Sequence, residues 1–177
     1  MLRHLWQLAQ WLVIPRFIVP ILLISSFQVQ AKPVLLVMGD SLSASYGMNQ
    51  DQGWVSLLAK KSQMQPAHVV YASLSGETAC EGKQRLKALM AQHQPKWLIL
   101  QLGANDALRG QNLKHSQQNL QEMIDTCQAP RCHLLLLGIR LPTNYGPAYD
   151  LALQKMYQQL AEQNALLFDP FFLEDIA

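Results

Sequence analysis

The sequence has little charge and no concentration of charge of one sign. Charged residues make up 15% of the 177-residue chain, with 14 Lys and Arg against 12 Asp and Glu. Nucleic-acid-binding proteins carry clustered basic residues, and charged tails carry runs of one sign. The sequence has neither pattern, and it also lacks internal repeats and low-complexity stretches. It therefore predicts no nucleic-acid partner and favours small, neutral or apolar ones.

A long hydrophobic run is also lacking. The apolar stretch at residues 17–27 contains Pro20 and is too short for a membrane-spanning helix, which needs about 20 residues. Arg3 and Arg16 lie before it, and small or modest residues lead up to Ala31. These features are typical of a secretory signal peptide. We predict cleavage after Ala31 and export to the periplasm or the medium; a retained membrane anchor is the alternative.

Removal of the signal peptide, residues 1–31, leaves one domain at residues 32–177. Two of the 14 basic residues are in the leader, so the domain has 12 basic and 12 acidic residues and is formally neutral. A chain of this length buries one good hydrophobic core but not two. We therefore predict a single domain.

Cysteine is scarce, with three residues at Cys80, Cys127 and Cys132. In an oxidising compartment Cys127 and Cys132, separated by a short Gln-Ala-Pro-Arg turn, could join a helix end to the next strand. Two free thiols are the alternative, since bridge geometry cannot be read from sequence. Cys80 has no evident partner and no histidine nearby in sequence, which argues against a catalytic thiol.

The sequence does have a regular alternation of short apolar runs and longer amphipathic ones. The apolar runs lack polar alternation, which indicates parallel strands buried on both faces. We predict a three-layer α/β/α sandwich around a parallel five-stranded sheet. The predicted strands are 34–38, 68–72, 97–102, 133–137 and 166–168, and the predicted helices are 54–61, 80–92, 113–127 and 149–163.

Polar segments follow the first four predicted strands. In a parallel α/β sheet the ligand site lies beyond the carboxyl ends of the strands, so these loops are expected to converge at one edge. Neither core formation nor helix capping requires this, so the convergence indicates a functional site. The segments are Gly39-Asp40-Ser41-Leu42-Ser43, Ser73-Leu74-Ser75-Gly76-Glu77-Thr78, Gly103-Ala104-Asn105-Asp106 and Gly138-Ile139-Arg140-Leu141-Pro142.

Three residues of these segments have chemistry that suits acyl transfer. Ser41, directly after a strand, can expose its hydroxyl as a nucleophile and turn its own backbone N–H toward a substrate oxygen. Gly76 lets its backbone N–H approach a ligand closely, and Asn105 offers an amide donor to an oxyanion. Each has a structural alternative: a helix N-cap for Ser41 and Asn105, and a simple turn for Gly76.

These blocks resemble the first three signatures of the SGNH (GDSL) hydrolases. Other stretches are similar to the bacterial thioesterase I, lysophospholipase and arylesterase group within that family, and the resemblance runs from Pro33 to the end of the chain. The additional stretches are Leu74-Ser75-Gly76-Glu77-Thr78, His93-Gln94-Pro95-Lys96-Trp97, Leu108-Arg109-Gly110 and Ile139-Arg140-Leu141-Pro142-Thr143-Asn144-Tyr145-Gly146.

The resemblance implies a serine hydrolase that acts on acyl esters, acyl thioesters and lysophospholipids through an acyl-enzyme on Ser41. The oxyanion hole would consist of the backbone N–H groups of Ser41 and Gly76 and the side chain of Asn105. No cofactor and no metal are expected, and a monomer is expected.

The loops that flank the site are expected to form a wall of the acyl pocket. Leu108, Leu141 and Pro142 are the residues we predict to contact the substrate, because their loops are rich in Gly and Pro and lie beside the site. A carbohydrate acetylesterase is a further alternative, and the Leu141–Gly146 stretch argues mildly against it.

The family's general base has no counterpart in the sequence. The family supplies an Asp and a His from a late Asp-x-x-His loop that precedes a final helix. None of His68, His93, His115 and His133 has an acidic residue three positions earlier, and no His follows Asp169 or Asp175. A serine hydroxyl needs such a base to act as a nucleophile, and we do not expect these four histidines to replace it.

Two interpretations follow. The chain is either a fragment of a working esterase, whose Asp, His and last helix lie beyond Ala177, or a catalytically impaired, ligand-binding relative. We expect a fragment, because a domain without the last helix would expose apolar residues at 166–168 and 171–172 and be unstable. Reading the coding sequence past Ala177 for Asp-x-x-His separates the two.

Overall fold

A computed structural model of the chain describes three stretches, all within one compact unit, Lys32–Ala177. Residues 1–31 lie outside the described residues, so the signal peptide and its cleavage stay predictions. No helix in the described stretches is long and apolar enough to cross a membrane. The described residues are 33–64, 68–127 and 132–174.

The core of this unit is a five-stranded sheet in which every neighbouring pair is parallel. The strand order is β2-β1-β3-β4-β5, the doubly wound order in which the strand order reverses between β1 and β3 while all strands stay parallel. This confirms the predicted parallel sheet, with strand ends within one residue of those expected. The strands are β1 (Leu35–Gly39), β2 (Val69–Tyr71), β3 (Trp97–Gln101), β4 (His133–Leu137) and β5 (Leu167–Asp169).

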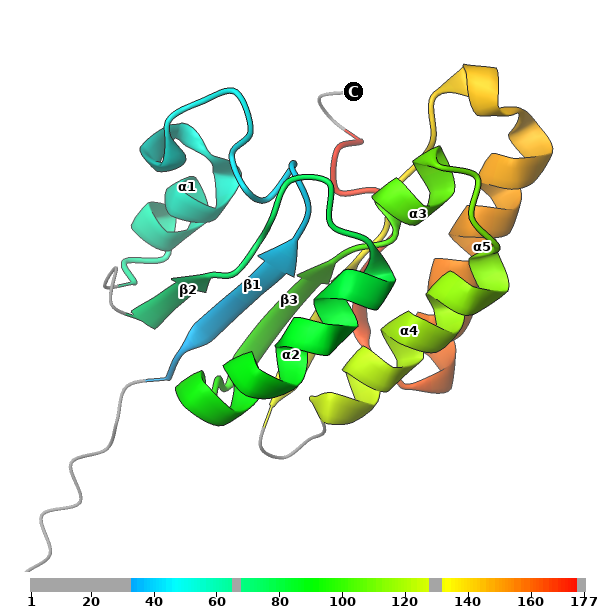
Figure 1. Cartoon of the computed structure of the whole chain (residues 1–177). Coiled ribbons are helices and arrows are strands. Elements are labelled where there is room, and N and C mark those ends of the chain that lie inside the picture. The colour runs from blue at the N-terminus through cyan, green and yellow to red at the C-terminus, as the bar shows by residue number, and fades with distance from the viewer. Residues whose placement is uncertain (1–32, 65–67, 128–131, 175–177) are drawn as a thin grey trace, which may run out of the picture. The chain divides into compact units, whose positions relative to one another are not determined.

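Helices cover both faces of the sheet, as the buried, uninterrupted apolar strands predict. One core cluster joins α2, α4 and α5 to one face, through residues such as Leu36 and Met38; the other joins α1 to the opposite face, through Leu35 and Val37. Figure 1 shows α2 and α4 side by side and α3 beyond the end of β3. The helices are α1 (Trp54–Lys61), α2 (Ala79–His93), α3 (Ala104–Leu108), α4 (Leu113–Thr126) and α5 (Pro147–Gln163), with 3₁₀ turns η1 (Gln50–Gln52) and η3 (Thr143–Tyr145).

Helix starts depend on capping residues that apolar spacing does not show. α2 begins one residue earlier than predicted, because Thr78 is its N-cap and exchanges hydrogen bonds with Glu81 in a capping box. α5 begins two residues earlier because Pro147 occupies its first position, where the missing N–H costs nothing. The five-residue helix α3 was not predicted, since it is too short for helical periodicity.

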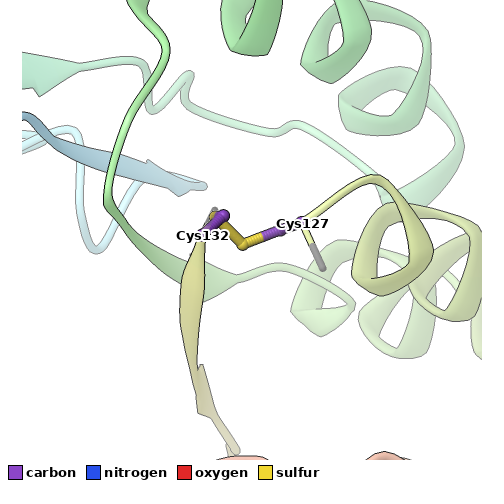
Figure 2. Close-up of a disulfide and its surroundings, with 2 residues drawn as sticks. All are labelled: Cys127 and Cys132. Atoms are coloured by element: carbon purple, nitrogen blue, oxygen red, sulfur yellow. A yellow bond between two sulfur atoms is a disulfide. The ribbon is translucent and has the colours of Figure 1, made fainter. Parts of the chain in front are cut away.

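A disulfide joins Cys127 to Cys132, as Figure 2 shows. Cys127 is the C-cap of α4 and Cys132 immediately precedes β4, and their Cα atoms are 5.1 Å apart. The bridge therefore links a helix end to the next strand, which resolves the alternatives left open by the sequence. Cys80 is a free, exposed cysteine on α2.

The α1 face of the sheet is less completely covered near β5. Leu167 is 64% exposed, and its partner on β4, Leu135, is half-buried. Farther along, Phe172 packs on Trp54 of α1 with ring centroids 5.2 Å apart. The described residues thus leave part of β5 exposed, whereas the segment after β5 covers part of α1.

Candidate active site

The loops after β2, β1 and β3 lie side by side at the carboxyl edge of the sheet. Leu74 N donates to the Gly39 carbonyl oxygen at 3.0 Å, so the loop after β2 still follows the end of β1. Ser41, Gly76 and Asn105 come shortly after the ends of these three adjacent strands. The structure thus places the loops of the three predicted site residues at one edge.

Ser41 lies two residues after the end of β1, at the start of a series of turns. Tyr46 N donates to the Ser41 carbonyl oxygen at 3.1 Å, and the chain enters no helix before η1 at Gln50. Ser41 is therefore not a helix N-cap. Its side chain is half-buried, and neither its N–H nor its hydroxyl has a hydrogen-bond partner among the described residues. Both groups are available to a substrate.

The exit from β1 is tight because a buried polar contact lies against it. Ser43 Oγ donates to Gln101 Oε1 at 2.7 Å. A Cβ atom on Gly39 would lie 2.6 Å from Gln101 Oε1 and 2.7 Å from Ser43 Oγ. Only glycine fits at this position without moving the contact, so Gly39 helps to fix the path of the chain toward Ser41.

Asp40, next to Ser41, is 2% exposed. Its Oδ1 accepts from Leu42 N at 3.1 Å, whereas its Oδ2 and the Gln101 amide nitrogen have no hydrogen-bond partner among the described residues. Burial raises the pKa of the Asp40 carboxyl. Two nearby groups oppose this rise by favouring the charged form of the carboxyl: the Gln101 amide and the Leu42 N–H. The Gln101 amide does so without forming a hydrogen bond to Asp40. Burial therefore disfavours a negative charge beside the nucleophile.

Gly76 occupies the third position of a tight turn. Glu77 N donates to the Leu74 carbonyl oxygen at 3.2 Å, and Gly76 has φ of +80°, as the third residue of a type II turn requires. The turn type sets the orientation of the Ser75–Gly76 peptide and hence the direction of the Gly76 N–H. No described residue accepts a hydrogen bond from that N–H. Gly76 thus has both a defined turn and an available donor.

Asn105 lies inside α3, whose N-cap is Gly103, so the N-cap alternative is wrong. Asn105 Nδ2 donates to the Glu77 carbonyl oxygen at 3.1 Å. An asparagine amide has two N–H donors. The bond to Glu77 therefore fixes the amide against the Gly76 turn and leaves a second N–H for a ligand.

Asp106 supports this arrangement, although we predicted no role for it. Its carboxylate accepts from Ala79 N at 2.8 Å and from Ser116 Oγ at 3.0 Å, and it is 1% exposed. These bonds connect α3 to the first residue of α2 and to α4. Asp106 directly follows Asn105 in sequence, but its partners are distant along the chain and only the fold reveals them.

Leu108, Leu141 and Pro142, the predicted substrate contacts, differ in exposure. Leu108 is 41% exposed, and its carbonyl oxygen accepts from Tyr145 Oη at 3.2 Å, which ties the end of α3 to η3. Pro142 is exposed, whereas Leu141 is 8% exposed and packs within the larger core cluster. Their contact with a substrate stays a prediction, and Leu108 has the more accessible leucine side chain.

No histidine in the described part of the chain hydrogen-bonds to Ser41. His68 precedes β2, His133 begins β4 and His93 ends α2, which places these three at the amino edge of the sheet. His115 is exposed in the first turn of α4.

The two late aspartates, Asp169 and Asp175, do not supply the missing partner for a catalytic histidine. Asp169 Oδ1 accepts from Phe171 N at 3.1 Å, a local turn contact, and Asp175 lies outside the described residues. In the described stretches no three His, Cys, Asp or Glu side chains form a group that could hold a metal ion.

The fold and the site together define a class of protein. Among the described residues, a serine with an unpaired hydroxyl and N–H follows an interior parallel strand. The Gly76 N–H and the second N–H of the Asn105 amide, also without partners in these stretches, follow the strands on either side. This is the arrangement by which serine hydrolases attack an acyl carbonyl and stabilise the resulting oxyanion.

Comparisons with known proteins agree with that class. The model of the GDSL-like Lipase/Acylhydrolase family matches residues 37–176. The chain is 41% identical over 155 residues to Thioesterase 1/protease 1/lysophospholipase L1 of Escherichia coli (strain K12), covering 88% of this chain and 74% of that protein. It is 44% identical over 151 residues to Esterase TesA of Pseudomonas aeruginosa, covering 84% and 75%.

A solved structure shows the same fold. The crystal structure of AlinE4, a SGNH-hydrolase family esterase, superposes with a TM-score of 0.75 at 32% identity, over 83% of this chain and 80% of that one. The chain belongs to the GDSL-like lipase/acylhydrolase family, the SGNH hydrolases, and is a serine hydrolase by family.

Proposed function

We propose that Ser41 is the nucleophile of an acyl hydrolase and that Ser41 N–H, Gly76 N–H and the Asn105 amide form its oxyanion hole. Ser41 Oγ bonds to the acyl carbon, the alcohol or thiol leaves with a proton, and water then releases the acid from the acyl-enzyme. The observation that carries this is the convergence on adjacent strand ends of three groups that each keep an N–H without a partner among the described residues.

The substrates we propose are acyl esters, acyl thioesters and lysophospholipids. The relatives are named as a thioesterase and lysophospholipase and as an esterase, and all of these substrates present the same acyl carbonyl. The exposed Leu108 and Pro142 side chains supply apolar surface on the β3 and β4 side of the site. We assign the acyl chain to that side.

Ser41 needs a base, and an imidazole held by a carboxylate is the usual one. None of the described histidines hydrogen-bonds to Ser41. The protein for the test should therefore be produced from its complete coding sequence. Reading that sequence for Asp-x-x-His past Ala177 shows whether the same chain supplies the pair.

The test is hydrolysis of p-nitrophenyl esters and acyl-CoA by the wild type, Ser41→Ala and Ser62→Ala. We expect wild-type turnover, a loss of roughly 10⁴-fold or more in Ser41→Ala, from the cost of losing a triad member, and full activity in Ser62→Ala. Ser62 is an exposed C-cap on α1 and controls for removal of a serine. Retained activity in Ser41→Ala would refute the mechanism. An inactive wild type that still binds fatty acid would favour the impaired, ligand-binding alternative.

We also propose export through a signal peptide at residues 1–31. The disulfide between Cys127 and Cys132 supports this, because such bonds persist in oxidising compartments. Amino-terminal sequencing of the protein from a periplasmic fraction should begin at Lys32. An intact amino terminus in that fraction would argue instead for a retained anchor.

A further inference from the structure

A partly buried ion pair lies beside the Gly76 turn and connects it to α2. Arg85 donates from Nε to Glu77 Oε1 at 2.6 Å and from Nη2 to Glu77 Oε2 at 2.8 Å. The side chain of Glu77 is 3% exposed and that of Arg85 is 34% exposed. Two parallel charge-assisted bonds of this kind fix direction as well as distance. The ion pair therefore restricts the conformation of Glu77.

The same guanidinium attaches the turn to the end of the sheet. Arg85 Nη2 also donates to the Ala72 carbonyl oxygen at 2.6 Å, and Ala72 directly follows β2. Ala72 N in turn donates to the Val37 carbonyl oxygen of β1 at 2.9 Å. Arg85 thus connects Glu77 to the two strands whose ends lie nearest the turn.

The main chain of Glu77 contacts two of the proposed oxyanion donors. Glu77 N closes the type II turn that orients the Gly76 N–H, and the Glu77 carbonyl oxygen accepts from Asn105 Nδ2. We propose that Arg85 and Glu77 are positioning residues, whose ion pair sets the direction of the Gly76 N–H and of the Asn105 amide. This rests on the proposed function, in which these donors bind the oxyanion.

The chain offers a second ion pair on the same helix for comparison. Lys83 Nζ lies 3.2 Å from Glu122 Oε2, with side chains 30% and 61% exposed. This pair joins α2 to α4 and does not contact the Gly76 turn. Removal of the Lys83 charge therefore tests what an ion pair on α2 contributes when it does not contact the turn.

The kinetic test uses the double variant Glu77→Gln/Arg85→Met, Arg85→Lys and the control Lys83→Met. The double variant removes both charges, so no unpaired charge is left in the interior. Since misplaced catalytic groups chiefly reduce turnover, we expect kcat to fall about 100-fold with KM within about twofold. Arg85→Lys keeps the charge but not the two parallel bonds, so its kcat should fall less than that of the double variant. Lys83→Met should have the kcat of the wild type.

A readout independent of catalysis is the NMR signal of the Asn105 side-chain amide, assigned by its loss in Asn105→Ala. In the wild type the proton bonded to Glu77 should resonate apart from the other and exchange slowly. In the double variant the two should converge and exchange faster. If the double variant does not fold, Arg85→Lys provides the same comparison, with a smaller convergence expected.

These readouts separate failure of the inference from failure of the proposed function. An Asn105 signal unchanged from the wild type in a folded variant would overturn the positioning role, whatever the activity. Equal losses of kcat in Lys83→Met and the double variant would overturn it as well. A wild type that hydrolyses no ester would refute the proposed function, while the Asn105 signal would still decide whether the ion pair orients the amide.

Discussion

The two edges of the sheet differ in the chemistry of their loops. At the carboxyl edge, Ser41, Gly76 and Asn105 follow adjacent strands, and each keeps a donor that has no partner in the described part of the chain. At the amino edge, the chain enters β4 from the disulfide between Cys127 and Cys132. A parallel sheet gathers strand ends and helix starts at one edge, which makes that edge the natural ligand site.

The comparison separates activity from stability. The carboxyl edge keeps donors without partners in the described stretches and a glycine with positive φ. In the proposed function these features serve binding at some cost in stability. The amino edge has a covalent link between α4 and β4, which contributes stability without facing the site. Substitutions at the carboxyl edge should therefore chiefly lower kcat, whereas substitutions at the amino edge should chiefly lower the free energy of unfolding.

After the loss expected for Ser41→Ala, replacement of Asn105 by Ala should have the largest effect. Loss of one oxyanion donor costs about 10²- to 10³-fold in kcat, and the Glu77 carbonyl oxygen also loses its partner. Steady-state kinetics with a p-nitrophenyl ester measure this loss of kcat. Asn112→Ala is the matched control: Asn112 caps α4, so that variant should lose stability and retain kcat. Equal kcat in the Asn105 variant and the wild type would remove Asn105 from the oxyanion hole.

Gly76→Ala should lower kcat by roughly 10- to 100-fold, since an alanine is strained at positive φ and the turn that directs the N–H would relax. Gly110→Ala provides the control, because Gly110 has φ of +65° and no atom within 4 Å of an added Cβ. Both variants should lose about 1 kcal/mol of stability from backbone strain, measured by urea unfolding. If kcat fell equally in both variants, the loss could not be assigned to the Gly76 N–H as an oxyanion donor.

The double variant Cys127→Ser/Cys132→Ser should have the opposite profile. Opening a loop this short costs about 2 kcal/mol in the free energy of unfolding by the chain-entropy account. At a temperature where the variant is folded, kcat should equal that of the wild type. Cys80→Ser, at the exposed free cysteine, should change neither quantity. A large loss of kcat in the folded double variant would show that the two edges are not separable.

The smallest expected effect is on acyl-chain preference. Leu108→Ala should change the ratio of kcat/KM for long and short p-nitrophenyl esters by a few-fold. This is less than the roughly 10-fold or more of an apolar contact in an enclosed pocket, because Leu108 is 41% exposed. Leu141→Ala should change preference too, but also destabilise the fold, because Leu141 belongs to the core cluster. An unchanged preference in Leu108→Ala would remove Leu108 from the pocket.

Most of the sheet could be predicted from the sequence, because buried parallel strands appear as short uninterrupted apolar runs. The run His133–Leu137 has the predicted bounds, and each of the other strands differs from its predicted bounds by one residue at one or both ends. The loops after these strands could be predicted for the same reason. α3 could not, because five residues form barely more than one helical turn and give no periodic signal.

The supporting contacts of the site could not be predicted. Arg85 has the pattern of an ordinary polar position on an amphipathic helix, and its bond to Glu77 depends on how α2 packs against the loop after β2. Asp106 likewise bonds to α2 and α4. Which of several equivalent-looking polar residues find partners is decided by tertiary packing, whereas sequence patterns report local structure.

The most direct test of the account is a crystal structure of the protein, produced from its complete coding sequence, after reaction with an alkyl phosphonate. We predict a covalent phosphonate on Ser41, with one oxygen roughly 2.7–3.1 Å from the N–H groups of Ser41, Gly76 and Asn105. A phosphonate on another residue, or one on Ser41 whose oxygen contacts neither Gly76 nor Asn105, would contradict the proposed oxyanion hole.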